Sequence, residues 1–209
     1  NDILDLSRIE SGTMDFQLSS YNLTFIMQQV YDSQRLSMSQ GAELRTDFPE
    51  GTGKSMITDS VRLKQVVNNL INNAKKFTTK GYILLGYRVE DSGHTVIFVE
   101  DTGAGISDEN LGHIFERFYQ VQQTSEKTGS GIGLHIANEY VHLHKGTISV
   151  TDNFPKGSVF TVKLPIVTYA SEKEELLPEL LNNDKAPNEL PVPNAEELRY
   201  TILLVDDNK

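Results

Sequence analysis

The sequence predicts an α/β domain of roughly 150 residues, with extensions, within a chain of 209 residues. Apolar residues recur at helical spacing over residues 60–76, and Asp59 stands where it can cap that helix. Two alternating runs, 81–89 and 94–101, predict a hairpin across a turn at 91–93. A helix and a strand pair in one domain of this length indicate the α/β class.

The composition is that of an ordinary globular domain, with 38% hydrophobic and 23% charged residues. No run approaches the roughly 18 apolar residues of a membrane span. The net charge of −10 argues against nucleic-acid binding, so no nucleic-acid partner is expected. The absence of cysteine excludes disulfides and thiolate metal sites. It fits a cytoplasmic location, whether or not the parent protein is anchored in the inner membrane.

Periodicity and caps predict the elements of the N-terminal part. Ile3, Leu6 and Ile9 have helical spacing, and Gly12 ends that helix. Asn22 is placed to cap a second helix. The elements expected here are a helix over 1–10, a strand over 14–18, a helix over 23–38 and a strand over 42–48.

The segment GTGKS at 51–55 looks like the end of a phosphate-binding P-loop. That motif needs a glycine where this chain has Phe48, and its helix begins directly after the loop. The next helix of this chain starts only at Asp59. The segment 49–54 is therefore interpreted as a surface turn.

The second half of the domain contains one long polar segment among short elements. Ser107 is placed to cap a helix of about ten residues that ends near Phe118. Residues 120–130 are polar and aperiodic, which inside a compact domain favours a functional lid. The other expected elements are a helix from Gly131 to about His144 and strands over 146–151 and 158–164, joined by a turn at 153–157 and ended by Pro165.

Asn69, Asn73 and Lys76 should share one face of the helix over 60–76, because residues three and four apart lie above one another. Amide oxygens beside a lysine suit a magnesium ion and phosphates. Asparagines on a helix are also common on a solvated face, and this pattern leaves the two interpretations evenly balanced.

Two glycine-rich turns supply further candidates. In DTGAGI at 101–106, Asp101 offers an acceptor where Gly103 and Gly105 let a flat, polar molecule approach the backbone. In TGSGIGL at 128–134, alternate glycines lead into a helix, whose first N–H groups attract phosphate. Each turn alone could be a simple turn or hinge, but both turns with the asparagine helix form a joint signal.

These motifs, in this order, resemble those of the catalytic, ATP-binding domain of sensor histidine kinases, within the superfamily that includes gyrase, heat-shock protein 90 and mismatch-repair ATPases. The matching segments are NLINNAKKFT at 69–78 (the N box), DTGAGI at 101–106 (the first G box), IFERFYQ at 114–120 (the F box), GSGIGL at 129–134 (the second G box) and GSVFTVKLP at 157–165 (the closing strand). The resemblance covers roughly residues 13–167. It implies a two-layer α/β sandwich of the Bergerat type, a mixed sheet packed under helices, with ATP between the helices and the lid.

The resemblance also implies residue roles. Asp101 would accept the exocyclic amine of adenine, Asn73 would ligate Mg²⁺, and Asn69 would support that site. Lys76 would face the phosphates, so that Asn69, Asn73 and Lys76 are the implied catalytic residues. The implied ATP-binding residues are Asn69, Asn73, Lys76, Phe77, Asp101, Gly103, Gly105, Ile106, Phe118, Tyr119, Lys127, Gly129, Ser130, Gly131, Ile132, Gly133, Leu134 and Thr161.

Some roles stay open within the resemblance. Phe115 and Phe118 would anchor the lid by burial, and either Lys127 or Arg117 would reach the γ-phosphate. Hydrolysing relatives usually carry a glutamate where this chain has Asn69, and an amide cannot accept a proton from water at neutral pH. The asparagine therefore favours transfer to a protein side chain. An ATP-hydrolysing switch and a non-catalytic pseudokinase are the alternatives.

The flanking segments imply a hybrid kinase that passes the γ-phosphate of ATP to a histidine and then to a receiver aspartate. Residues 1–12 resemble the end of the second dimerisation helix, whose partner helix would carry the histidine and make the full-length protein a homodimer. Residues 168–199 contain eight acidic residues, three basic residues and four prolines, as a linker would. Residues 200–209 look like the first strand of a truncated receiver domain, with Asp206 and Asp207 as magnesium-site carboxylates. The residues between, 13–167, form the catalytic ATP-binding domain.

Overall fold

The computed structural model describes residues 2–50, 55–120 and 130–166. The helices are α1 (Asp2–Glu10), α2 (Leu23–Arg35), α3 (Ser60–Phe77), α4 (Asp108–Leu111) and α5 (Gly133–Leu143). The strands are β1 (Ser19–Asn22), β2 (Ala42–Asp47), β3 (Ser55–Thr58), β4 (Gly81–Glu90), β5 (His94–Asp101), β6 (Thr147–Asp152) and β7 (Ser158–Pro165).

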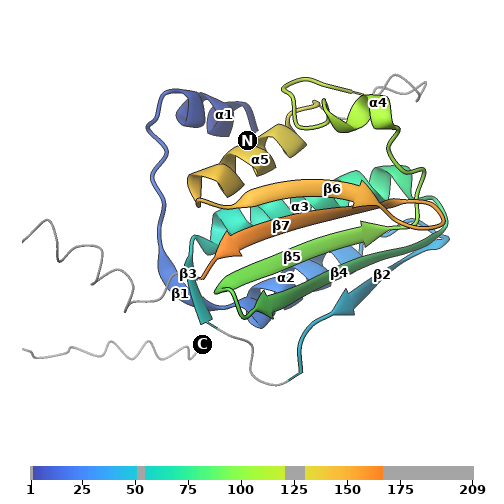
Figure 1. Cartoon of the computed structure of the whole chain (residues 1–209), viewed down its shortest axis with the longest axis horizontal. Coiled ribbons are helices and arrows are strands. Elements are labelled where there is room, and N and C mark those ends of the chain that lie inside the picture. Colours follow the sequence, from blue (N-terminus) through green and yellow to red (C-terminus); the bar gives the residue numbers. More distant parts are fainter. Residues whose placement is uncertain (1, 51–54, 121–129, 167–209) are drawn as a thin grey trace, which may run out of the picture. The chain divides into compact units, whose positions relative to one another are not determined.

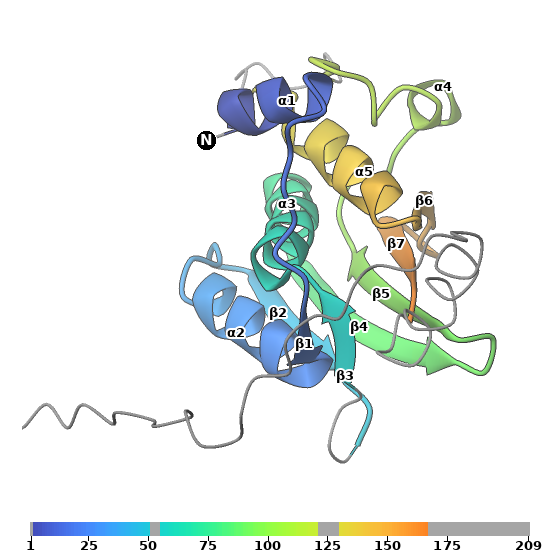
Figure 2. The same ribbon diagram turned by 90° about the vertical axis from the view of Figure 1, so that its left-hand side faces the viewer.

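Five strands form a mixed sheet in the order β2-β4-β5-β7-β6. The β2–β4 pair is parallel and the other neighbouring pairs are antiparallel. Figure 1 and Figure 2 show α2, α3 and α5 together on one face of this sheet. The predicted two-layer α/β sandwich is thereby confirmed, since one layer is a mixed sheet and the other is helical.

The central helix α3 forms where its cap and its apolar stripe predict it. The carboxylate of Asp59 accepts hydrogen bonds from the backbone N–H groups of Val61 and Arg62, at 2.9 and 3.1 Å. The stripe is buried as predicted, and its members are Leu63, Val66, Val67, Leu70, Ile71 and Ala74. Full burial of a Leu, Ile or Val side chain stabilises a fold by about 1.5–3 kcal/mol. This helix therefore anchors the helical layer to the sheet.

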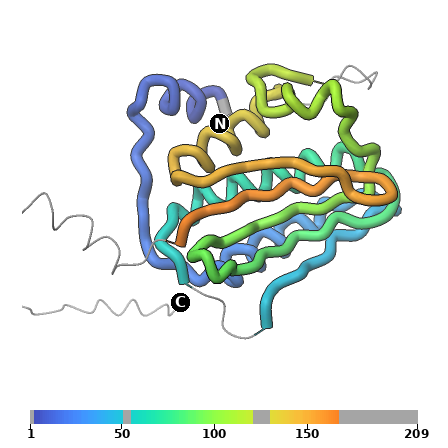
Figure 3. Tube along the Cα trace, in the orientation of Figure 1, coloured from blue at the N-terminus to red at the C-terminus, as the bar shows by residue number. Residues whose placement is uncertain are grey.

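One predicted strand is wrong. Residues 13–18 form no strand and run as a link from α1 to β1 (Figure 3). The strand begins at Ser19 instead and pairs antiparallel with β3, in the register Ser19 to Thr58. The sequence patterns did not predict β3. Both strands are four residues long and depend on a partner far away in the sequence, which local periodicity does not reveal.

The predicted ten-residue helix after Ser107 is also wrong, because α4 has only four residues. The side chain of Ser107 makes no cap hydrogen bond with the backbone and accepts one from Asn110 Nδ2 at 2.7 Å. The chain then continues in turns, so Phe118, with φ of +61°, is 59% exposed. The predicted burial of Phe118 fails for this reason. Phe115 does pack against the core, beside Phe160.

Some predictions concern residues outside the described part of the chain. These are the turn at 51–54, most of the polar segment including Lys127 and Gly129, the acidic segment 168–199 and the receiver-like strand at 200–209. The helix predicted from Gly131 begins two residues later, at Gly133, since Gly131 has a left-handed φ of +70°. Among the described helices, none is both long enough and apolar enough to span a membrane.

The helix α1 is attached to the domain through a partly buried polar cluster. Arg62 Nη1 lies 3.1 Å from Asp5 Oδ1 and donates to Tyr140 Oη at 2.9 Å. Gln65 donates to the other oxygen of Asp5 at 3.0 Å. Burial acts to raise the pKa of Asp5, but the hydrogen bond from Gln65 and the charge of Arg62 lower it overall. Leu6 is 3% exposed and belongs to the hydrophobic core, so α1 packs against the rest of the domain.

His144, at the end of α5, gives the fold an expected pH dependence. Its Nε2 atom is buried and has no hydrogen-bond partner among the described residues. Burial lowers the pKa of His144, and the nearby Asp59 carboxylate opposes this effect only partly. Folding therefore favours the neutral ring. The resulting stability is complete above the unfolded pKa of about 6.5 and is lost as the pH falls through the folded pKa.

We expect the unfolding temperature of the protein to fall between about pH 7.5 and about pH 5.5, and to fall less in His144→Leu. Circular dichroism melts at each pH would measure the difference. His142→Leu removes an exposed histidine two residues away and should keep the slope of the unmodified protein. Parallel slopes for the unmodified protein and His144→Leu would contradict the assignment.

Candidate functional site

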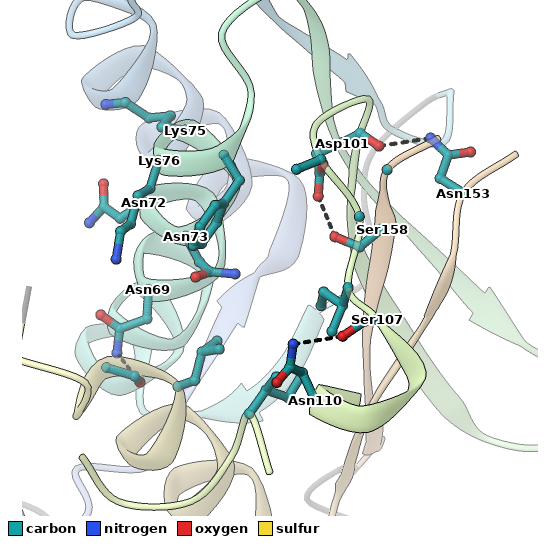
Figure 4. Close-up of a pocket in the computed structure, with 18 of the residues that line it drawn as sticks. Asn69, Asn72, Asn73, Lys75, Lys76, Asp101, Ser107, Asn110, Asn153 and Ser158 are labelled. Atoms are coloured by element: carbon teal, nitrogen blue, oxygen red, sulfur yellow. Dashed lines mark hydrogen bonds between the residues drawn. The ribbon is translucent and has the colours of Figure 1, made fainter. Parts of the chain in front are cut away.

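A cavity of about 1390 Å³ lies between the C-terminal half of α3, the turn after β5, the start of α5 and the β6–β7 turn. Its volume exceeds the roughly 300–1,000 Å³ of common small-molecule sites. Figure 4 shows polar side chains of α3 on one side of it, with Asp101 and Ser158 on the other. A ligand in this cavity would therefore be contacted by α3, the turn after β5, the start of α5 and the β6–β7 turn.

The α3 wall carries the asparagines that the sequence singles out. Figure 4 shows the Asn73 amide on the side of α3 that faces Asp101 and Ser107. Asn73 has no hydrogen-bond partner among the described residues, so its amide oxygen is free for a ligand. Asn69 Nδ2 donates to the backbone oxygen of Gly133 at 2.9 Å, which ties α3 to the start of α5. Both residues line the cavity, so they are placed where a bound ligand could contact them.

Two adjacent lysines on α3 have different surroundings. Lys76 is exposed and lines the cavity, and its Nζ lies 5.1 Å from the centroid of the Phe77 ring. Lys75 Nζ instead donates to Gln34 Oε1 at 3.1 Å and to Ser37 Oγ at 2.7 Å. Burial lowers the pKa of Lys75. Lys76 is therefore the cation of this pair that is free to meet phosphate.

Asp101 is held in place at the end of β5 and is only 3% exposed. Its Oδ1 atom accepts a hydrogen bond from the Gly103 N–H at 2.8 Å, and its Oδ2 atom accepts one from Ser158 Oγ at 2.5 Å. A carboxylate offers roughly four acceptor positions. Thr78 Oγ1 also donates to Oδ1, at 3.5 Å. One of the four positions is therefore left for a donor on a bound molecule, since the residue lines the cavity.

Two glycines allow the chain to pass close to Asp101. A Cβ atom on Gly103 would lie 2.6 Å from the backbone oxygen of Phe77 and 2.8 Å from Asp101 Oδ1. A Cβ atom on Gly157, whose φ is +127°, would lie 1.9 Å from the backbone oxygen of Asp101. A side chain at position 103 would collide with the Phe77 backbone and the Asp101 carboxylate, and one at position 157 would collide with the Asp101 backbone. The observed packing around Asp101 therefore requires glycine at both positions.

The opposite end of the cavity is lined by Ser130, Gly131, Gly133 and Leu134. Here α5 begins, and its cap residue, Ile132, makes no side-chain cap hydrogen bond. The first N–H groups of a helix lack partners within the helix and carry the positive end of its dipole. This end of the cavity is therefore suited to an anionic group such as phosphate.

Most of the predicted ATP-binding residues that the structure describes line this cavity. They are Asn69, Asn73, Lys76, Phe77, Asp101, Gly105, Ile106, Tyr119, Ser130, Gly131, Gly133 and Leu134. Four described residues do not line it. Gly103 donates its N–H to Asp101, Ile132 is buried in the core and Phe118 is exposed. Thr161 lies on the face of β7 opposite to Ser158 and Phe160. Lys127 and Gly129 are outside the described residues.

One site residue that the sequence patterns did not reveal is Ser158, three positions before Thr161. Side chains alternate between the two faces of a strand. In β7, Ser158, Phe160 and Val162 are buried, so Thr161 points to the other face. Ser158 pairs with Asp101 in the register of β5 and β7. The sequence contains a signal for this position. Ser158 follows Gly157 directly and lies two residues before Phe160, so strand alternation places both side chains on the same, buried face.

Asn153 in the β6–β7 turn was also missed. Its Nδ2 atom donates to the backbone oxygen of Asp101 at 2.9 Å and to Glu100 Oε1 at 3.2 Å. Tyr82 donates to the same Glu100 oxygen at 2.6 Å, and this hydrogen bond is the main reason that the pKa of Tyr82 is raised. The turn is thus joined to the strand end that carries Asp101. No sequence motif marks this contact.

The donor set fits a magnesium ion held jointly by protein and phosphate. Within the described residues, no three histidine, aspartate or glutamate side chains gather as a metal cluster. The free amide oxygen of Asn73 is a hard oxygen ligand, and Mg²⁺ is often bound by one or two protein ligands, substrate phosphates and water. Arg117 forms an ion pair with Glu10 of α1 and does not line the cavity.

The chain is similar to known proteins in sequence and in structure. A family model described as "Histidine kinase-, DNA gyrase B-, and HSP90-like ATPase" matches residues 58–168. The chain is 34% identical, over all of its length, to the autoinducer 2 sensor kinase/phosphatase LuxQ of Vibrio cholerae. It is 38% identical, over 85% of its length, to the hybrid signal transduction histidine kinase L of Dictyostelium discoideum.

Among solved structures, full-length ShkA in complex with AMPPNP is similar with a TM-score of 0.70 and 27% identity. The match covers 80% of this chain and 35% of that one. The chain spans 24% of the Vibrio relative and 11% of the Dictyostelium relative. The similarity therefore concerns a part of each of these larger proteins. Apart from Ser37 and Ser39, the residues that line the cavity lie within the segment that the family model matches.

Proposed function

We propose that the cavity binds ATP with Mg²⁺ for transfer of the γ-phosphate to a histidine. The premise is that the chain belongs to the family of histidine kinase-, DNA gyrase B- and heat-shock protein 90-like ATPases. The observation that carries the proposal is the opposition of Asp101 to Asn73 across one cavity that ends at the start of α5. At one end of the cavity, Asp101 offers an acceptor for a nucleotide base. At the other end, the asparagine amides of α3 and the N–H groups at the start of α5 suit the phosphates and their metal ion.

The residues that line the cavity have different roles in the proposed reaction. Asp101 accepts the exocyclic amine of adenine, and Ser158 with Gly103 fixes the orientation of its carboxylate. Asn73 holds Mg²⁺, which when bound neutralises phosphate charge. Lys76 and the start of α5 attract the phosphates, while Asn69 keeps α5 against α3. Positioning and charge stabilisation supply most of the catalysis in phosphoryl transfer.

Transfer of the γ-phosphate is favoured over hydrolysis of ATP because positions 69 and 73 of α3 carry asparagine and not a carboxylate. The side chain of Asn69 is an amide, which is not basic enough at neutral pH to accept a proton from water, so it cannot act as a general base. The full-length protein is proposed to be a homodimer in which histidine-bearing helices receive the phosphate and a receiver aspartate takes it next. The names of the relatives, a sensor kinase/phosphatase and a hybrid kinase, support this.

Calorimetric titration of the chain with a non-hydrolysable ATP analogue tests the proposal. We expect binding that strengthens when Mg²⁺ is added, and no stable labelling of the chain itself by radioactive ATP. Extension of the chain by the histidine-bearing helices of its parent protein should allow labelling at the histidine. Absence of nucleotide binding would support a pseudokinase instead, and rapid multiple turnover of ATP without a histidine would support a hydrolysing switch.

A matched pair of substitutions on β7 tests the role of Ser158. Ser158→Ala removes the hydroxyl that orients Asp101, so nucleotide affinity should fall about tenfold, the effect of losing one hydrogen bond to a charged group. Thr161→Val lies on the opposite face of the same strand and should leave the affinity within about twofold. Equal losses in both variants, measured by calorimetry, would show that strand packing rather than Asp101 is affected.

A further inference from the structure

The β6–β7 turn, residues 153–157, places an aromatic side chain at the edge of the cavity. Phe154 is 95% exposed and lines the cavity together with Pro155 and Lys156. Phe25 is also exposed, at 62%, but it is on α2 and does not line the cavity. Single exposed apolar residues are common and need no explanation. Phe154 differs because its ring adjoins a ligand-sized space.

The turn that carries Phe154 is attached to Asp101. Asn153 Nδ2 donates to the backbone oxygen of Asp101 at 2.9 Å, and Figure 4 shows the two residues side by side. The Asn153 N–H donates to Gly157 O at 3.1 Å, which closes the turn. A Cβ atom on Gly105 would lie 3.3 Å from Gly157 O, so the turns at 101–106 and 153–157 are in contact. Phe154 therefore belongs to the end of the cavity where Asp101 lies.

We infer that the β6–β7 turn is a wall of the base-binding end of the site and that Phe154 stacks on the purine ring. A base whose amine edge faces Asp101 still has two apolar faces to cover. Aromatic rings stack on every base, because each base has a π face. Phe154 would therefore add affinity for purine nucleotides in general, while Asp101 selects adenine. This inference rests on the proposed function, since it concerns the same site.

The chain contains no tryptophan, so Phe154→Trp provides a single fluorescent reporter. Its emission should change on titration with ATP, ADP and adenosine and should saturate at the Kd that calorimetry gives. Phe25→Trp places the same reporter on an exposed site outside the cavity and should not respond. An unchanged emission of Phe154→Trp at saturating ATP would overturn the inference.

Phe154→Ala should weaken ATP, ADP and adenosine by the same factor, about fivefold to twentyfold, because stacking involves the base and not the phosphates. Lys76→Ala should instead weaken ATP more than adenosine. Phe154→Tyr keeps an aromatic ring and should bind within about twofold of the unmodified protein. Thermal melts would show whether Phe154→Ala is folded, which its exposure leads us to expect.

The outcomes separate this inference from the proposed function. If the unmodified protein binds ATP and Phe154→Ala binds it equally well, the inference fails and the proposed function stands. If Phe154→Ala loses ATP affinity but keeps adenosine affinity, the ring acts on the phosphates and stacking is disproved. If the unmodified protein binds no nucleotide, both fail.

Discussion

Asp101→Asn is expected to weaken ATP binding roughly 100-fold, equivalent to about 2.7 kcal/mol, while leaving the fold intact. The amide can keep its oxygen on the Gly103 N–H, and its NH₂ group can donate to the Ser158 hydroxyl, which is able to accept. The internal contacts are therefore preserved. The acceptor that faces the cavity is replaced by a donor, which opposes the amine of adenine.

Calorimetry with ATP and with adenosine would measure the loss, which should be similar for both ligands because it concerns the base. Thermal unfolding should show a midpoint close to that of the unmodified protein. Asp91→Asn changes an exposed carboxylate in the β4–β5 turn and serves as the matched control. An affinity of Asp101→Asn within about twofold of the unmodified protein would remove Asp101 from the base-binding role.

Asn73→Ala is expected to abolish the dependence of ATP binding on Mg²⁺ and to lower phosphate transfer by roughly 1,000-fold, since a bound metal supplies several kcal/mol of charge stabilisation. The amide of Asn73 faces the cavity and has no other partner within the described residues, so its removal breaks no internal hydrogen bond. The loss should therefore appear in catalysis and metal binding and not in stability.

Asn72→Ala is the informative comparison because the neighbouring amide also lines the cavity but is exposed. It should retain the Mg²⁺ dependence and most of the activity. Transfer would be followed with labelled ATP and the chain extended by its histidine-bearing helices, and adenosine affinity should stay unchanged in Asn73→Ala. A normal Mg²⁺ dependence in Asn73→Ala, or equal losses in both variants, would contradict the assignment of Asn73 as the metal ligand.

The sequence predicted the central helix and the four antiparallel strands because these elements carry local signals. The stripe on α3 has a cap and a clear helical period, and β4, β5, β6 and β7 were each placed within a residue of their ends. The strand predicted at 14–18 and the long helix after Ser107 failed. In both regions distant partners decide the conformation, namely β3 for the first and the contact of Phe118 with Gly131 for the second.

For the candidate site, the sequence by itself determined which motifs carry the polar and glycine residues. Asn69, Asn73, Lys76 and Asp101 were named from spacing and resemblance, and all four line the cavity. A motif can be recognised from the sequence because its chemistry requires particular residue types at a fixed spacing. Motifs do not say which face of a strand a side chain occupies. The resemblance implied Thr161, whereas the residue on β7 that contacts Asp101 is Ser158.

Only the tertiary structure decided the residues that complete the site from remote segments. Ser158 reaches Asp101 because β5 and β7 pair in one register, and Asn153 reaches it because the β6–β7 turn crosses that strand end. Phe154 then lies at the cavity edge because its turn is attached there. Such contacts depend on long-range strand pairing and on glycines that permit close approach. The sequence therefore determined the chemistry of the site, and the fold determined which side chains hold that chemistry in place.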